Sequence, residues 1–314
     1  MRLPRFLLLA LPVSAFLVMG ACGGTGNGFG GDAGQDTGNN NGDGGNPAGD
    51  SGINFGDSST DGSGTPDVAP PPPIDYVYCH SPSTLYKVDP VAKTMTTVGN
   101  FSGGDSSVID IAIDANSNGF ATTFGGVYKL DIKTAKLTLV KTGSYPNSLS
   151  FVPKGTLDPN VEALVGYLDA QYVRIDTTSG AVTPVGTGLS GAYISSGDIV
   201  SVINGGTFLT VKNDPNSSST DCSASDCLFQ IDPKTGAMIQ NYGSINHNSV
   251  FGLAFWAGTA YGFDDAGELF SITWQNNALV TTNIPTTPNL QFWGAGSTTS
   301  APPTSADGGG LPIN

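Results

Sequence analysis

Carboxylates dominate the reactive side chains of this sequence, which has only two histidines, His80 and His247, and two glutamates, Glu162 and Glu268. Four aspartates recur in a similar context, each after a short alternating apolar stretch: Asp89, Asp131, Asp176 and Asp232. An aspartate that opens a turn accepts hydrogen bonds from amides about two residues later, and a following glycine supplies a positive φ. We therefore interpret these four aspartates as hairpin corners and not as copies of a catalytic group.

Two other aspartates, Asp110 and Asp198, lie in apolar segments that we expect to line the centre of the fold. A pair of carboxylates on either side of the scissile bond is what glycoside hydrolysis requires. The sequence has no Gly-x-Ser-x-Gly, P-loop or paired Cys-x-x-Cys motif. We therefore predict a protein that is not an enzyme and has no catalytic residues, and keep a hydrolase or lyase acting on glycans through this pair as the alternative.

One short segment resembles half of a calcium loop. Asp114, Asn116 and Asn118 have the alternate spacing of the first ligands of such a loop. The twelfth position is Gly125, where the loop requires a bidentate glutamate. A tight hairpin uses the same residue types, so we predict no metal and no cofactor, with Ca²⁺ at this turn as the alternative.

The cysteines are typical of an exported protein. Cys222 and Cys227 lie five residues apart in a polar segment, and in an oxidising compartment we expect them to form a disulfide. Their spacing is poor for zinc, because no second pair and no nearby histidine accompany them. Cys79 lies in an alternating strand-like run, and we expect it to be a buried free thiol.

The elements that must position these side chains repeat along the chain. The copies begin at Leu85, Val127, Tyr172, Leu228 and, in a weaker form, Leu269. Their spacings are 42, 45, 56 and 41 residues, and the longest contains the two-cysteine segment. Within one period, 108–114, 119–124, 127–131 and 136–140 each have the pattern of a short strand. Four strands in a period of about 40 to 45 residues, without helical periodicity, are typical of β-propeller blades.

The ends of the repeat region predict a closed ring. Residues 76–80 look like a second strand with no first strand before it, and residues 289–296 look like a first strand with nothing after it. Joined, they complete one blade and remove the exposed sheet edges. We predict an all-β fold, a five-bladed β-propeller over residues 75–296, with a β-sandwich or a sixth degenerate blade as alternatives.

Two resemblances extend this prediction. The repeated pattern Leu-Tyr-x-Ile-Asp-x-x-Thr-Gly resembles the repeats of NHL, YVTN and quinoprotein-like propellers, which implies a fold and not an activity. Its copies here are variants, such as Leu-Tyr-Lys-Val-Asp-Pro at 85–90 and Leu-Phe-Gln-Ile-Asp-Pro-Lys-Thr-Gly at 228–236. The N-terminus has Arg2 and Arg5 before an apolar run over 6–19, and the sequence from Met19 to Cys22 resembles the lipobox of bacterial lipoproteins. That resemblance implies a signal peptide over 1–21 and a lipidated Cys22. An ordinary secretory signal is the alternative.

Composition separates the remaining segments. Residues 23–73 contain 16 glycines, seven aspartates and no lysine or arginine, so we expect 22–74 to be a disordered acidic tether that begins at the lipidated cysteine. We expect 297–314 to be a disordered tail.

The predicted propeller carries 18 acidic and 10 basic residues, and this net charge of −8 argues against nucleic acid. We expect a monomer in the bacterial cell envelope, at the outer membrane, whose lipid anchor makes the membrane contact.

We expect binding on the loops that join second to third strands and that link one blade to the next. These loops include the two-cysteine segment, and a disulfide there would lower the cost of ordering the loop on binding. The polar and aromatic candidates on this face are Tyr145, Asn147, Tyr193, Asn246, His247 and Asn248. The predicted function is non-catalytic binding of a protein or glycan, or scaffolding.

Overall fold

The structure is a computed structural model that describes residues 77–286, 290–304 and 310–312. The expected signal peptide, Cys22 and the acidic tether lie outside these residues. No helix in the described part of the chain is long and apolar enough to cross a membrane.

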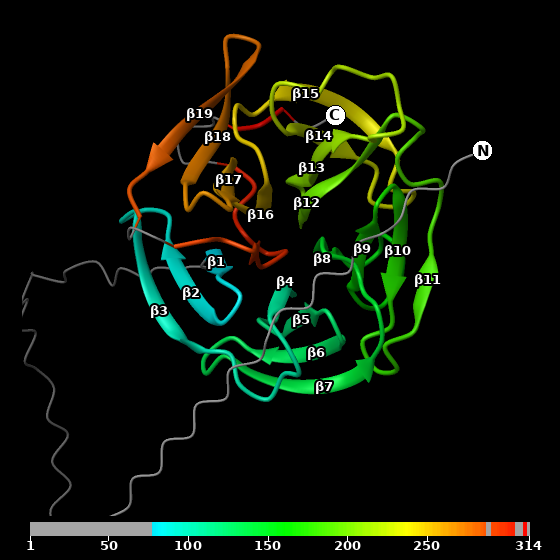
Figure 1. Cartoon of the computed structure of the whole chain (residues 1–314), viewed down its shortest axis with the longest axis vertical. Coiled ribbons are helices and arrows are strands. Elements are labelled where there is room, and N and C mark those ends of the chain that lie inside the picture. The colour runs from blue at the N-terminus through cyan, green and yellow to red at the C-terminus, as the bar shows by residue number, and fades with distance from the viewer. Residues whose placement is uncertain (1–76, 287–289, 305–309, 313–314) are drawn as a thin grey trace, which may run out of the picture. The chain divides into compact units, whose positions relative to one another are not determined.

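The described residues form five four-stranded antiparallel sheets around a central axis (Figure 1). Blade 1 contains β1 (Val77–His80), β2 (Thr84–Asp89), β3 (Thr94–Asn100) and β20 (Gly294–Ser297). Blade 2 contains β4 (Val108–Ile113), β5 (Gly119–Thr123), β6 (Gly126–Asp131) and β7 (Lys136–Thr142). Blade 3 contains β8 (Leu149–Val152), β9 (Ala163–Leu168), β10 (Gln171–Ile175) and β11 (Val182–Pro184).

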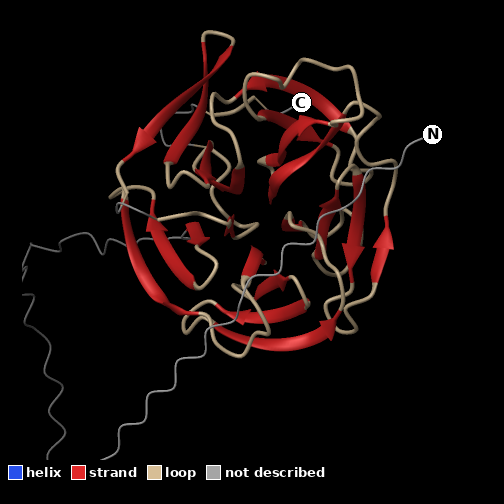
Figure 2. Ribbon diagram, viewed as in Figure 1, coloured by secondary structure: helices blue, strands red, loops and turns tan. Residues whose placement is uncertain are grey.

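Two blades complete the ring. Blade 4 contains β12 (Tyr193–Val202), β13 (Gly206–Asn213), β14 (Cys227–Ile231) and β15 (Met238–Ser244). Blade 5 contains β16 (Val250–Trp256), β17 (Thr259–Asp264), β18 (Leu269–Gln275) and β19 (Ala278–Ile284). The described residues contain strands, turns and loops and no helix, as Figure 2 shows. The predicted five-bladed propeller is confirmed.

Blade 1 is closed by both ends of the described chain. β20 pairs antiparallel with β1, with Val77 opposite Ser297 and His80 opposite Gly294. The innermost strands β4, β8, β12, β16 and β20 surround the axis, and the last strand of each blade lies at the outside (Figure 1). Two surfaces follow from this order. We call the surface formed by the turns between second and third strands and by the linkers between blades the loop face, and the opposite surface the corner face.

The repeated aspartates are turn residues on the corner face. The Asp89 carboxylate accepts the amides of Val91 and Ala92, both at 2.9 Å. Asp131, Asp176 and Asp232 accept the amide two residues later in the same way. Blade 5 turns differently, because Asn276 and Asn277 both have positive φ, 51° and 61°, which is the conformation of a two-residue type I′ hairpin.

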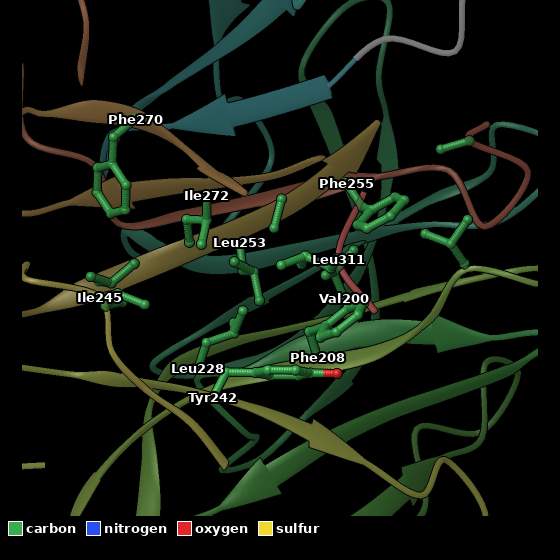
Figure 3. Packing of buried hydrophobic residues seen from close by; sticks show 14 residues of the cluster. Val200, Phe208, Leu228, Tyr242, Ile245, Leu253, Phe255, Phe270, Ile272 and Leu311 are labelled. Atoms are coloured by element: carbon green, nitrogen blue, oxygen red, sulfur yellow. The ribbon is translucent and has the colours of Figure 1, made fainter. Parts of the chain in front are cut away.

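The apolar core consists of five clusters, and each joins two neighbouring blades. Figure 3 shows the cluster between blades 4 and 5, where Phe208 of β13 stacks on Phe255 of β16 with ring centroids 5.9 Å apart. The other four clusters join blades 1 and 2, 2 and 3, 3 and 4, and 5 and 1. Burial of apolar surface stabilises by about 25 cal/mol per Å². Because each cluster needs both blades, no blade has a complete core of its own.

The packed chain extends beyond Gly296, where we expected the propeller to end and a disordered tail to begin. Ser297 belongs to β20, and Ala301 and Leu311 are buried against the cluster between blades 4 and 5. The Thr299 carbonyl accepts the Ile203 amide at 2.8 Å. The prediction failed because the segment is polar except for a few small or isolated apolar residues, which composition alone does not distinguish from a tail.

The described cysteines are arranged as expected. Cys222 and Cys227 form a disulfide, and Cys79 is a buried free thiol in β1.

Candidate functional site

The structure brings Asp110 and Asp198 together at the axis of the propeller. Asp110 lies in β4 and Asp198 in β12, and both side chains have a relative exposure of 0%. The two carboxyl groups interact directly, since each affects the pKa of the other. This is the pair on which the hydrolase alternative depends, and it is sealed from solvent.

The two carboxyls accept backbone amides of the innermost strands. Asp198 accepts the Leu253 amide from β16 and the Ile199 amide from β12, both at 2.6 Å. Asp110 accepts the Ile111 amide at 2.8 Å, and the Leu149 amide of β8 serves both groups. An innermost strand has no neighbour on its axial side, and buried amides must find acceptors. The two aspartates therefore connect four blades at the axis.

Burial raises the pKa of Asp110 well above its ordinary value, and the adjacent Asp198 carboxylate raises it further. Burial also raises the pKa of Asp198, although the amides of Leu253 and Ile199 partly offset the effect. Like charges this close cannot both remain ionised in a buried site. We assign the proton to Asp110, because Asp198 accepts more amides.

His80 lies beside this pair. Its Nδ1 donates to the Ser81 carbonyl at 2.9 Å, and its buried Nε2 has no hydrogen-bond partner among the described residues. Burial lowers the pKa of His80 to about 4, so the ring is neutral at physiological pH. A Cβ on Gly294 would lie 2.4 Å from His80 Nε2 and 2.5 Å from Asp110 Oδ1. Glycine is therefore required where β20 passes between the ring and the carboxyl.

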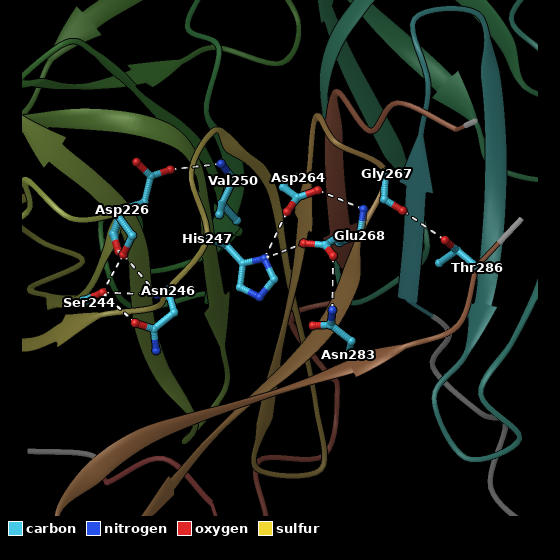
Figure 4. Close-up of polar contacts among 11 residues, drawn as sticks. Asp226, Ser244, Asn246, His247, Val250, Asp264, Gly267, Glu268, Asn283 and Thr286 are labelled. Atoms are coloured by element: carbon cyan, nitrogen blue, oxygen red, sulfur yellow. Dashed lines mark hydrogen bonds and ion pairs between the residues drawn. The ribbon is translucent and has the colours of Figure 1, made fainter. Parts of the chain in front are cut away.

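A second cluster lies on the loop face between blades 4 and 5. His247 is in the linker between β15 and β16, Asp264 ends β17, and Glu268 is in the turn before β18. Figure 4 shows that the imidazole points between the two carboxylates. His247 Nδ1 lies 3.0 Å from Asp264 Oδ2 and 3.2 Å from Glu268 Oε2. The side chains of His247 and Asp264 are 9% and 4% exposed, whereas that of Glu268 is 47% exposed, so the cluster opens to solvent on one side.

Neighbouring groups hold each member of this cluster. Asp264 Oδ1 accepts the Glu268 amide at 2.8 Å, and Glu268 Oε1 accepts the Asn283 side chain at 3.2 Å. The His247 ring stacks on Phe270, with centroids 3.6 Å apart and an interplanar angle of 6°. Burial raises the pKa of Asp264. The side chains are therefore held in place without a ligand.

The disulfide-closed insert lies directly beside this cluster. The insert, residues 214–226, joins β13 to β14, and its Asp226 amide donates to the His247 carbonyl at 2.9 Å. The Asp226 carboxylate accepts the Val250 amide at 2.9 Å (Figure 4). On the other side of the insert, the Tyr193 hydroxyl donates to Asp221. The insert is thus fixed between the start of β12 and the linker that leaves blade 4.

The six residues expected on the binding face have different environments. Asn246 and Asn248 are exposed next to His247, and Asn147 is exposed in the linker between blades 2 and 3. Tyr193 is half-buried against the insert. Tyr145 is 8% exposed and its hydroxyl donates to the Gly180 carbonyl of blade 3, so it packs between blades and does not belong to an open surface.

In the turn from Asp114 to Asn118, the Asp114 carboxylate accepts hydrogen bonds from residues of the same turn. Asp114 Oδ1 accepts the amides of Asn116 and Asn118 at 2.9 and 2.8 Å, and Oδ2 accepts the Asn118 side-chain amide at 2.7 Å. These are the hydrogen bonds of a tight turn.

The turn also borders a groove of about 1180 Å³ on the corner face, whose charged lining residues are Lys129, Lys133, Lys154, Arg174, Asp114, Asp131, Glu162 and Asp176. With equal numbers of each sign, this lining favours neither anions nor cations.

The loop face carries an aromatic pair that we did not predict, formed by the exposed Phe124 and the half-buried Trp293. Phe124, in the turn between β5 and β6, is 67% exposed. Trp293, in the linker before β20, contacts it edge to face with ring centroids 6.1 Å apart. The sequence pattern assigned Phe124 to the expected strand 119–124 and Trp293 to the expected strand 289–296, whereas the structure places both in loops beside a strand. Sequence analysis also did not propose Asp264 and Glu268 as site residues. The available signal was that the chain has only two histidines and two glutamates, and that His247 and Glu268 are one of each.

Comparisons with known proteins supply a fold likeness only. No protein-family model matches the chain, and no curated protein matches it. Among solved structures, it is similar to the hydrazine synthase of Kuenenia stuttgartiensis, with 11% sequence identity and a TM-score of 0.38. The match covers 69% of this chain and 65% of that chain. At this identity and score the likeness carries no functional argument.

Proposed function

We propose that this protein is a non-catalytic binding or scaffolding protein of the bacterial cell envelope. A lipid on Cys22 holds it at the outer membrane, and the acidic segment 22–74 separates the lipid from the propeller. The lipobox-like sequence from Met19 to Cys22 supports the anchor, and the repeat pattern supports a relation to NHL, YVTN and quinoprotein-like propellers.

The observation that carries the binding proposal is the aromatic pair on the loop face, in which Phe124 is exposed and Trp293 is half-buried. Phe124 leaves 67% of its surface in water next to the ring of Trp293. Exposed apolar surface in a soluble domain often marks an interaction site, and a pair of aromatic rings offers rigid contact area to a sugar face or a protein side chain. The disulfide-closed insert on the same face adds a second ordered loop.

The buried axial pair supports the non-catalytic part of the proposal. A glycosidase needs one carboxyl to protonate the leaving group and another to act on the sugar or on a water molecule. Asp110 and Asp198 are both fully buried and accept amides from four blades. These amides give both carboxyls a structural role that requires no substrate.

Photocrosslinking in the native cell tests the binding surface. A photoreactive phenylalanine at position 124 should form adducts with an envelope component. The control position is Leu139 on the outer strand β7, which is 50% exposed and lies away from the loop face. Adducts at 124 and not at 139 would support the proposal, and equal or absent labelling at the two positions would contradict it.

Membrane fractionation tests the anchor separately. Cys22→Ala or globomycin treatment should block processing and remove the mature protein from the membrane fraction. Unchanged processing and fractionation would refute the lipid anchor and leave the binding surface to be judged by the crosslinking result.

A further inference from the structure

We propose that His247, Asp264 and Glu268 form a binding site for a divalent transition-metal ion, of which Zn²⁺ suits the donor set best. One imidazole nitrogen and one oxygen from each carboxylate face a common point, and the three donor atoms all lie within 4.8 Å of one another. This inference goes beyond the proposed function and does not depend on it, because a metal could bind here whether or not the loop face has a partner.

One oxygen of each carboxylate is available to a metal ion. Each carboxylate has one oxygen held by the protein: Asp264 Oδ1 by the Glu268 amide, and Glu268 Oε1 by the Asn283 side chain. The other oxygen of each points at His247 Nδ1, at 3.0 and 3.2 Å. Hydrogen bonds that fix the outer oxygen of a ligand while the inner one faces the ion are typical of metal centres.

A hydrogen on His247 Nδ1 can pair with only one of the two carboxylates. A single Nδ1–H faces two carboxylate oxygens, and only the contact with Asp264 is a hydrogen bond. Within the described residues, no lysine or arginine pairs with either carboxylate, so two negative charges share one imidazole. The Asp264 side chain is only 4% exposed, and a charge in so dry a position is costly unless it is paired. A divalent cation at the common point would neutralise both carboxylates at once.

The distances and ligand types select the class of ion. Zn²⁺ lies at about 2.0 to 2.2 Å from imidazole nitrogen and carboxylate oxygen, which places neighbouring ligands roughly 3 to 3.5 Å apart. Ca²⁺ and Mg²⁺ prefer sets composed only of oxygen, so a histidine ligand argues against them. Three protein ligands would leave a position open on the exposed side of Glu268, where water or a partner could bind.

Calorimetric titration of the purified, chelator-treated full chain with ZnCl₂ tests the proposal. His247→Phe removes the ligand and retains an aromatic ring that can stack on Phe270. Glu268→Gln removes one carboxylate from an exposed position and retains an oxygen for Asn283. Asp265→Asn is the matched control, because Asp265 is an exposed neighbour outside the cluster.

We expect one site that is lost in His247→Phe, weakened at least tenfold in Glu268→Gln and unchanged in Asp265→Asn. Zn²⁺ should also raise the Tm of the wild type and of Asp265→Asn, but not that of His247→Phe. All four proteins share Cys22 and the acidic segment before residue 77, so zinc bound there cancels in the comparison.

Equal zinc affinity in the wild type and Glu268→Gln, at equal Tm, would overturn the proposal even if His247→Phe failed to fold. Binding of CaCl₂ as tight as that of ZnCl₂ would overturn the assignment to a transition metal.

Discussion

Aspartates perform three different tasks in this chain, and the surroundings of each residue determine which. Those at the hairpin corners, such as Asp131, are exposed and accept amides of their own turn. Asp110 and Asp198 accept amides from different strands in a dry environment, so their ionisation is coupled to the closure of the ring. Asp264 directs one oxygen at the imidazole of His247 and the other at a backbone amide. Residue type alone predicts none of these differences.

Replacing Asp110 by asparagine should change the pH dependence of stability. Burial raises the pKa of Asp110 in the folded state, so above about pH 4 the folded chain retains a proton that the unfolded chain has lost. The contribution of Asp110 to the free energy of unfolding of the wild type therefore falls as pH rises. An asparagine at this position does not titrate and has no such pH dependence. Relative to the wild type, the free energy of unfolding of Asp110→Asn should increase by roughly 1.4 kcal/mol for each pH unit until the folded pKa is passed.

Urea unfolding between pH 4 and 8 measures this effect. His80 is present in both proteins, so its own titration cancels in the difference. Asp265→Asn, which alters an exposed carboxylate, should run parallel to the wild type. An Asp110→Asn curve parallel to the wild-type curve would show that Asp110 is not held protonated in the folded state.

Gly294→Ala should destabilise the fold through one methyl group. The new Cβ would lie 2.4 Å from His80 Nε2 and 2.5 Å from Asp110 Oδ1, which neither buried group can avoid easily. Overpacking of this kind costs roughly 1 to 3 kcal/mol. Gly99→Ala is the control, because its Cβ would approach no atom closer than 3.6 Å. Equal free energies of unfolding for the two variants would contradict the tight axial packing.

At the scale of elements, the linkers and the insert determine the loop face. In the linker over 245–249, the His247 carbonyl contacts the insert. The His247 side chain contacts the turn between the second and third strands of blade 5. This contact explains why the candidate site lies between two blades. The sequence pattern predicted the four strands of blade 2 to within a few residues, because alternation and turn residues are local properties. It could not predict that Asp264 and Glu268 meet His247, because that contact depends on the packing of two blades.

Reducing the disulfide should destabilise blade 4 and its neighbour. Both half-cystines are buried in the cluster between blades 3 and 4, and the closed loop is short. Loop-closure entropy predicts a contribution of about 2 kcal/mol. Dithiothreitol should therefore lower the Tm of the wild type to that of the Cys222→Ser, Cys227→Ser double variant and leave the variant unchanged. A wild-type Tm insensitive to the reductant, and equal to that of the variant, would contradict this contribution.

At the scale of the whole molecule, both ends of the described chain stabilise the ring. β20 and β1 complete blade 1, and the segment after β20 packs against blades 4 and 5. The closure was predictable, because the repeat had a missing first strand at one end and an additional one at the other. The packing of Ala301 and Leu311 was not, because two apolar residues in a polar segment give no periodic signal.

A chain that stops after Ser297 should fold but be less stable. It would lose the burial of Ala301 and Leu311 and leave the Ile203 amide without the Thr299 carbonyl. Together these changes should cost about 3 kcal/mol. Denaturant unfolding measures the difference, and a midpoint equal to that of the full chain would show that the segment contributes nothing to the fold.

We infer that the axial carboxylates hold the ring together, and we propose that function lies on the loop face. The most direct test incubates the wild type and Asp110→Asn with a panel of envelope glycans and chromogenic glycosides, and measures binding and product release together. We predict no turnover by either protein and any saturable binding unchanged by Asp110→Asn. Turnover by the wild type that Asp110→Asn abolishes would contradict the claim and establish the axial pair as catalytic.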